Sequence, residues 1–314
     1  MHLPSFLQSD QSFLPLNLGG NPFGWTSSPA DSFAVLDRFR EGGGSFVDTA
    51  DAYSCWADGH SGGESEQVIG DWMTDRGARS QMQIATKVAK KPDRMGLAHD
   101  NVVAALDESL DRLQTNYVDL YYAHADDESV PVADQVATFH SLVKSGKVRA
   151  IGLSNYSAER LQAWVESARE QRMTLPAAIQ PRYTMVSRSD YETQLVPMVQ
   201  EFGLAVFSYP ALASGFLTGK YRTEADFASN PRGGAARRYA EAGGLRVVDA
   251  LVRVAERHEV TPTSVVIAWL LGRGITSPIA SASVPEQLEP LLVGARLGLS
   301  EQDVSELDEA SAGF

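Results

Sequence analysis

Short apolar runs of strand length alternate with amphipathic stretches of helical length from about residue 16 to residue 292. This alternation is typical of βα units and predicts a parallel sheet covered by helices. We expect strands near 16–19, 45–48, 82–87, 117–122, 148–153, 177–180, 204–208 and 277–280. We expect helices near 29–41, 64–76, 100–113, 131–145, 157–171, 190–202, 245–258 and 285–293, with an extra helix over 260–272 that begins at Thr261 and Pro262.

The number of strand–helix pairs favours a closed barrel over an open sheet. By length alone, 314 residues could hold two domains, but (β/α)8 barrels commonly reach this size as one unit. We therefore predict an α/β protein, a (β/α)8 TIM barrel in which residues 1–314 form a single domain.

The composition excludes several classes of partner and site. No apolar run approaches the length of about eighteen residues that a membrane helix needs. A net charge of −13 argues against binding to nucleic acid or to anionic membranes. A single cysteine, Cys55, leaves no intrachain disulfide and no multi-cysteine metal site. Residues 1–11 lack the basic flank and apolar stretch of a secretory signal, so we expect a cytoplasmic protein.

Polar side chains stand at the carboxyl ends of successive predicted strands, which is where barrels of this kind carry their chemistry. Asp48 ends the second strand and Tyr53 follows in the loop, while Lys87 and His124 end the third and fourth apolar runs. Any one of these residues alone is more often a helix cap or half of an ordinary salt bridge. Together they provide the groups that reduction of a carbonyl requires.

The expected roles follow from the proton chemistry of each side chain. A tyrosine acting as an acid near neutrality benefits from a lowered pKa, which the Lys87 ammonium would provide by stabilising the Tyr53 phenolate. Asp48 would keep Lys87 charged and oriented, and a neutral His124 would polarise the carbonyl. None of the four can supply a hydride, so a cofactor is required. The segment Gly19–Gly24 lacks the glycine spacing of a dinucleotide-binding fold, so the cofactor must bind at a barrel mouth.

These motifs resemble those of the aldo-keto reductases. The segments that carry the resemblance are 46–53 (FVDTADAY), 63–66 (GESE), 117–122 (YVDLYY) and 146–156 (GKVRAIGLSNY), and the likeness extends from Gly19 to about Gln287. It implies that Asp48, Tyr53, Lys87 and His124 form a catalytic tetrad with Tyr53 as the proton donor. It also implies reduction of an aldehyde or ketone, possible substrates including keto-sugars, by NADPH, with NADH as an alternative.

The same resemblance assigns residues to the cofactor. Ser154, Asn155 and Gln180 would hold the nicotinamide carboxamide, Tyr209 would stack on its ring, and Leu212, Ser214 and Lys220 would belong to a loop over the pyrophosphate. On their own these residues could equally form a turn, a core amide and ordinary packing. After the last strand the chain departs from the commoner pattern, with Ser281 where many members have lysine and Gln287 where many have arginine.

Two features near the end of the barrel predict phosphate contacts. Ser283 and Glu286 have the spacing of a capping box with Pro285 in the first turn, and the helix start that they predict suits an anion. The segment 213–243 is basic and without periodicity, so we expect a long mobile loop that closes over the cofactor. Arg237 or Arg238 would supply the positive charge at the cofactor phosphate.

Two other functions remain open at this point. A protein of the same fold could bind the cofactor and act as a regulatory subunit with little turnover, as the potassium-channel β subunits do. A metal-dependent barrel hydrolase or isomerase would need clustered imidazoles, whereas the histidines are scattered at 2, 60, 99, 124, 140 and 258. The acidic runs 126–128 and 301–303 predict solvated faces, and loops near 21–25, 55–62 and 125–128 are expected to select the substrate.

Overall fold

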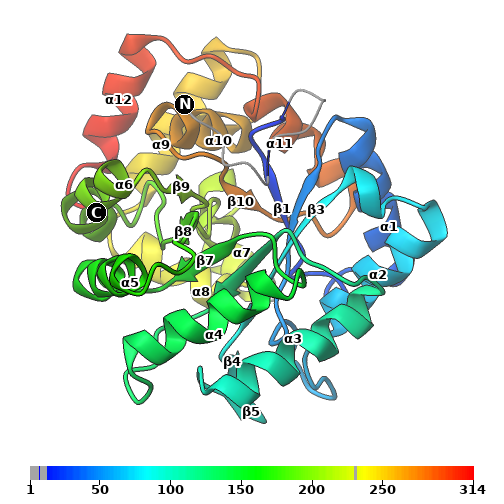
Figure 1. Cartoon of the computed structure of the whole chain (residues 1–314). Coiled ribbons are helices and arrows are strands. Elements are labelled where there is room, and N and C mark those ends of the chain that lie inside the picture. Colours follow the sequence, from blue (N-terminus) through cyan, green and yellow to red (C-terminus); the bar gives the residue numbers. More distant parts are fainter. Residues whose placement is uncertain (1–6, 8–12, 230–231) are drawn as a thin grey trace.

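A parallel sheet of eight strands forms the centre of the protein, seen in a computed structural model that describes Leu7, residues 13–229 and residues 232–314 (Figure 1). The strands are β1 (Asn17–Gly19), β2 (Phe46–Asp48), β3 (Gln83–Val88), β6 (Leu120–Ala123), β7 (Ile151–Ser154), β8 (Ala178–Gln180), β9 (Ala205–Val206) and β10 (Ile279–Ala280). Their order is β10-β1-β2-β3-β6-β7-β8-β9, and each pairing is parallel. Each predicted strand is therefore present, and neighbours in the sheet follow the order of the chain.

Backbone hydrogen bonds also join the two strands at the ends of this order. The Thr276 amide donates to the Val206 carbonyl at 3.0 Å, and the Ile279 amide donates to the Ser208 carbonyl at 2.9 Å. These bonds connect the segment around β9 with the segment around β10. The strands lie together at the centre of the molecule, and the helices surround them (Figure 1).

The predicted helices are confirmed within a residue or two, except that the helix predicted over 190–202 begins six residues later and that the helix predicted over 285–293 is divided. They are α1 (Pro29–Glu41), α2 (Glu64–Arg76), α3 (His99–Leu113), α4 (Val132–Lys144), α5 (Ala158–Glu170), α6 (Val196–Phe202), α9 (Leu245–Arg257) and α10 (Pro262–Gly272). Local signals explain several boundaries: the Ser28 hydroxyl accepts from the Asp31 amide at the start of α1, and Pro262 occupies the first turn of α10. A π-helical turn, η3 (Tyr191–Leu195), precedes α6.

Several elements were not predicted. A short hairpin, β4 (Lys90–Lys91) and β5 (Arg94–Met95), follows β3, and η2 (Arg79–Gln81) precedes it. The region expected to be a nonperiodic loop contains η4 (Ala213–Thr218), α7 (Glu224–Ala228) and α8 (Gly233–Glu241). The predicted helix 285–293 divides into η5 (Pro285–Gln287) and α11 (Glu289–Gly294), and α12 (Glu301–Ser311) lies beyond it.

The alternation of side chains along the strands separates two apolar clusters and determines which polar residues share a face. Val47, Ile84 and Tyr121 belong to the larger apolar cluster, whereas Phe46 and Ala85 belong to a smaller, separate cluster. Successive strand side chains point to opposite faces. Asp48 and Lys87 therefore share the face of Phe46 and Ala85, two residues earlier. By the same count His124 follows Tyr122 and Gln180 follows Ala178, both members of the smaller cluster.

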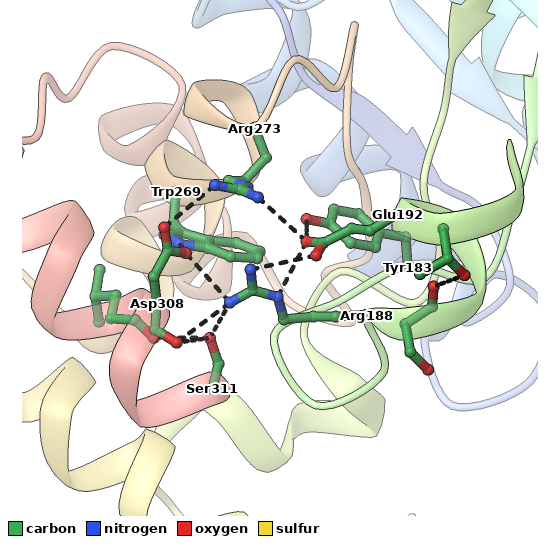
Figure 2. A network of polar contacts seen from close by, with 10 residues as sticks. Tyr183, Arg188, Glu192, Trp269, Arg273, Asp308 and Ser311 are labelled. Atoms are coloured by element: carbon green, nitrogen blue, oxygen red, sulfur yellow. Dashed lines mark hydrogen bonds and ion pairs between the residues drawn. The ribbon is translucent and has the colours of Figure 1, made fainter. Parts of the chain in front are cut away.

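A polar network connects the C-terminal helix to the segments around Arg188 and Arg273, as Figure 2 shows. Arg188 donates to Asp308 and Ser311 of α12, and its guanidinium also pairs with Glu192. Arg273 at the end of α10 bridges Glu192 and Asp308. The network links three segments that are distant in sequence, so it stabilises the packing of α12.

The prediction that the run 301–303 is only a solvated face was wrong. Asp303 is buried, forms a capping box with Ser300 at the start of α12, and accepts from Arg257 and His258. These donors outweigh burial and hold the pKa of the Asp303 carboxyl well below its usual range.

The run 126–128 is likewise more than a solvated face. Asp126 pairs with Arg160, and the Asp127 carboxylate accepts from the Leu97 amide at 2.8 Å. Both contacts tie the loop after β6 to neighbouring segments.

None of the helices in the described ranges is long and apolar enough to cross a membrane. Apart from Leu7, the segment 1–11 on which the expectation about a secretory signal rests lies outside the described residues.

Candidate active site

The four predicted catalytic residues lie together at the carboxyl ends of β2, β3 and β6. Asp48 is the last residue of β2, Lys87 is next to last in β3, and His124 directly follows β6. Tyr53 lies in the loop after β2, with its ring 6.2 Å from the His124 ring between centroids. The register of the parallel sheet therefore gathers side chains that are up to 76 positions apart in sequence, counted from Asp48 to His124.

Lys87 is the centre of this arrangement. Its Nζ donates to Asp48 Oδ2 at 2.5 Å, to the Thr49 carbonyl at 2.8 Å and to the Tyr53 hydroxyl at 2.8 Å. An ammonium has three donors, so all of them are used. Because Lys87 and Asp48 are both completely buried, these bonds fix the ammonium next to the phenol.

Asp48 accepts from several donors at once. In addition to Lys87, the Tyr53 hydroxyl donates to its Oδ2 at 3.0 Å, and the Gln180 amide donates to its Oδ1 at 2.8 Å. A buried carboxylate needs such donors to remain charged. Asp48 therefore acts as the acceptor that orients both Lys87 and Tyr53.

The direction of the Tyr53 pKa differs from the expectation. Burial and the nearby Asp48 charge hold the pKa of the phenol well above its usual value, although Lys87 donates to the same oxygen. Desolvation also lowers the pKa of Lys87, against the pull of Asp48. The expectation of a lowered tyrosine pKa was wrong for this structure, because burial and the carboxylate oppose formation of the phenolate.

The expectation of a neutral histidine agrees with its surroundings. Burial, together with the charges of Lys87 and Lys90, holds the pKa of His124 well below its usual value. Its Nδ1 is buried and has no hydrogen-bond partner among the described residues. A neutral imidazole has one N–H to donate, which suits a carbonyl oxygen.

The residues expected to hold a carboxamide form a chain of contacts beside the tetrad. The Ser154 hydroxyl donates to the Gln180 carbonyl at 3.0 Å. Asn155 has a positive φ of 57° and donates to the His124 carbonyl at 2.8 Å, while its Oδ1 accepts from the Tyr209 hydroxyl. The structure thus brings Ser154, Asn155, Gln180 and Tyr209 together, with the Gln180 amide turned towards Asp48.

A cavity of about 700 Å³ opens between the first loop, the segment after β9 and the loop after β10. Six of the predicted cofactor contacts are among its lining residues: Leu212, Ser214, Lys220, Ser281, Ser283 and Gln287. Trp56 lines the cavity as well, and its ring lies 6.1 Å from the Tyr53 ring between centroids. Trp56 thus connects the cavity with the neighbourhood of Tyr53, although none of the four predicted catalytic residues lines it.

The predicted capping box after β10 is not formed. Val284 is the N-cap of the short turn η5 and makes no side-chain cap bond. The Ser283 amide instead donates to Gln287 Oε1 at 2.9 Å, so Gln287 orders this loop from within. Glu286 faces the cavity, and it was not foreseen as a lining residue.

The arginines of the segment 213–243 differ in whether they line the cavity. Arg237 pairs with Glu224 of α7 and Arg238 lies over the Tyr239 ring, and neither is among the cavity-lining residues. Arg232 does line the cavity, where it donates to Asn21 at 3.4 Å and lies over the Trp25 ring. The sequence showed its charge but not which face of the segment it would occupy.

Two cations therefore face the cavity from this segment. The nearby charge of Arg232 adds to burial in lowering the pKa of Lys220. Two positive groups this close together favour an anionic ligand, since each raises the energy of the other in its absence.

In the described part of the chain, no group of three or more histidine, cysteine, aspartate or glutamate side chains is arranged to hold a metal ion. His2 lies outside the described residues.

Comparison with known proteins finds a matching family and relatives that cover most of the chain. The sequence profile of the aldo/keto reductase family matches residues 15–312. Norsolorinic acid reductase of Emericella nidulans is 31% identical over 314 residues, covering 94% of this chain and 77% of the relative. Aflatoxin B1 aldehyde reductase member 4 of Homo sapiens is 36% identical over 217 residues, covering 69% and 63%. A probable voltage-gated potassium channel subunit beta of Oryza sativa is 30% identical over 277 residues, covering 85% and 82%.

Proposed function

The chain belongs to the aldo/keto reductase family, and from this premise we propose that it reduces an aldehyde or ketone to the alcohol with hydride from NADPH. The observation that carries the proposal is the hydrogen-bonded group of Asp48, Tyr53 and Lys87, with His124 beside it. An ion pair with only a structural role would not require a phenol and a neutral imidazole at the same end of the sheet.

Tyr53 is the proposed general acid. Its raised pKa keeps the phenol protonated at neutral pH, so the proton is present at Oη when the carbonyl is reduced. An alkoxide forming on the substrate is a strong base, so it can accept this proton from Tyr53 Oη. Lys87, 2.8 Å from the same oxygen, stabilises the phenolate that this transfer leaves.

His124 is proposed to orient the substrate. Because its pKa is held low, the imidazole donates one N–H without competing as an acid. A hydrogen bond from it to the carbonyl oxygen would polarise the C=O bond and place that oxygen near Tyr53.

A nicotinamide dinucleotide, when bound, supplies the hydride. The residues at the cavity fit such a group: Lys220 and Arg232 offer charge to phosphates, and Ser281 and Ser283 offer hydroxyls. We favour Arg232 over Arg237 or Arg238 for this contact, because it is the arginine of the segment that lines the cavity. Glu286 on the same wall would oppose a further phosphate, so NADH remains the alternative to NADPH.

We also propose that the sheet closes as a (β/α)8 barrel and that the chain forms a single domain. We further propose that the protein acts in the cytoplasm and binds neither membranes nor nucleic acid. Family membership and the backbone bonds from Thr276 and Ile279 to the β9 segment support closure.

The direct experiment measures oxidation of NADPH and NADH against a panel of aldehydes, diketones, quinones and keto-sugars. Trp25 and Trp56 line the cavity, so the panel should include planar aromatic carbonyls. The proposal predicts saturable, substrate-dependent oxidation of at least one cofactor, with the alcohol as product.

The second candidate is a cofactor-binding regulatory subunit with little turnover. The likeness to the Oryza sativa protein named as a potassium channel subunit favours it. Tight cofactor binding by fluorescence, together with no carbonyl-dependent oxidation across the panel, would support this candidate and contradict the reductase.

A further inference from the structure

Asp51 is a buried acidic side chain that the proposed reaction leaves without a role. It lies in the loop between Asp48 and Tyr53 and is 1% exposed. Both of its carboxylate oxygens are buried, and no side chain among the described residues donates to them; the Ala52 backbone amide lowers the pKa of the carboxyl, but by less than burial raises it. Burial of an unpaired carboxylate is costly, so a structural role alone does not explain this residue.

Charged and titratable groups from every neighbouring element face Asp51. They are Glu66 on α2, Arg112 on α3, Lys87 on β3, Lys91 on β4, Tyr121 on β6 and Cys55 in its own loop. The cations among them are already engaged: Arg112 donates to Glu66 at 2.8 Å, and Lys91 pairs with Asp93 at 3.1 Å. Burial and the Glu66 charge raise the pKa of Asp51 to about 7.

Asp51 reaches the tetrad through Lys87. Its backbone amide donates to the Lys87 carbonyl at 3.2 Å, which fixes the loop alongside β3. The three donors of the Lys87 ammonium are used by Asp48, Thr49 and Tyr53, so none remains for the Asp51 carboxylate. The influence of Asp51 on Lys87 is therefore electrostatic, and its negative charge raises the pKa of the ammonium.

We propose that Asp51 is a positioning residue for the catalytic proton: the charge on its carboxyl group, acting on Lys87 in addition to Asp48, adjusts how tightly the Lys87–Tyr53 pair holds that proton. This inference rests on the proposed function, because it assumes that Tyr53 donates a proton during reduction.

The sign of the effect follows from the charges. At low pH Asp51 is neutral, the pair holds its proton less tightly, and Tyr53 is the stronger acid. As the pH rises through about 7 Asp51 becomes charged. The pair then holds its proton more tightly, so proton transfer to the substrate is slower, but the pair stays protonated to a higher pH.

The test compares the pH dependence of the wild type and Asp51→Asn. Single-turnover reduction of a substrate found in the panel should be followed by loss of NADPH absorbance. The wild-type rate should step down near pH 7, before the steeper fall at high pH. In Asp51→Asn the step should be absent, and the steep fall should begin about one pH unit lower. This is the order of magnitude of the pKa shift expected when one nearby charge is removed from a protein interior.

Asp111→Asn is the matched control, because Asp111 is exposed near the end of α3, outside the loops expected to select the substrate. It removes the same charge and should keep the wild-type profile. Asp51→Glu keeps an ionisable group and should retain a step with a shifted midpoint, so it replaces Asp51→Asn if that variant does not fold.

Two outcomes would overturn the inference: a wild-type profile with no step near pH 7, or a step that persists unchanged in the Asp51 variants. Neither can be confused with failure of the proposed function. A wild-type protein that reduces no carbonyl refutes that function before any variant is made, whereas an active enzyme with unaltered Asp51 variants refutes only the role of Asp51.

Discussion

Replacing Lys87 by methionine removes a charge from the centre of the site while keeping the shape of the side chain. Three donated hydrogen bonds disappear, to Asp48, to the Thr49 carbonyl and to Tyr53, from a side chain that is completely buried. The Asp48 carboxylate would keep the donors of Tyr53 and Gln180 but lose its counter-ion. Breaking one side of a buried ion pair costs about 3–5 kcal/mol in the free energy of unfolding.

The same change should slow the reaction, because the phenolate left by proton transfer loses the ammonium beside it. We expect a fall in kcat of about 100-fold or more, within the range for a general acid that loses its support. Urea unfolding followed by circular dichroism gives the stability, and single-turnover reduction gives the rate.

Lys144→Met is the control for this variant, since it makes the same change at an exposed position on α4. It should match the wild type in both measurements. A Lys87→Met protein with wild-type stability and rate would refute the reasoning. Loss of stability without loss of rate would reduce Lys87 to a structural role.

Three further predictions concern the cavity and the C-terminal helix. If the segment 213–243 closes over the cofactor, saturating NADPH should slow protease nicking between Arg222 and Arg246, and equal cleavage with and without cofactor would contradict closure. Arg232→Ala should raise the Kd for NADPH about 10-fold or more by fluorescence titration, whereas Arg237→Ala should not, and the reverse order would return the contact to Arg237. Asp303→Asn should lose about 1–3 kcal/mol of stability at pH 7 by urea unfolding; because the folded pKa is depressed, that contribution is lost on acidification below about pH 4, so a difference that stays constant down to pH 2 would contradict it.

Much of the fold could be predicted because its signals are local. Two helices begin where a serine or threonine is followed by proline, which is a sequence signal of a helix start: α1 after Ser28 and α10 after Thr261. The grouping of the four predicted catalytic residues could be predicted because the carboxyl ends of parallel strands lie at one end of the sheet. The short hairpin β4–β5 gave no such signal, because each of its strands has only two residues.

The remaining errors have tertiary causes. Arg232 and Arg237 lie five positions apart in the same basic segment, and only the packing of α7 and α8 decides which one meets the cavity. The error at Asp303 is an exception with a local cause, because Ser300 three residues before it is a sequence signal of a helix start. Burial reversed the expected direction of the Tyr53 pKa, and the extent of burial follows from the folded structure.

The central claim, that Tyr53 is the proton donor of a carbonyl reductase, is tested most directly by Tyr53→Phe. The ring remains and only the hydroxyl is lost, so the Kd for NADPH should stay near the wild-type value. The single-turnover rate of carbonyl reduction should fall by hundreds-fold or more, about 3–4 kcal/mol of lost transition-state stabilisation. A Tyr53→Phe protein that binds NADPH and reduces the same substrate at the wild-type rate would contradict the account.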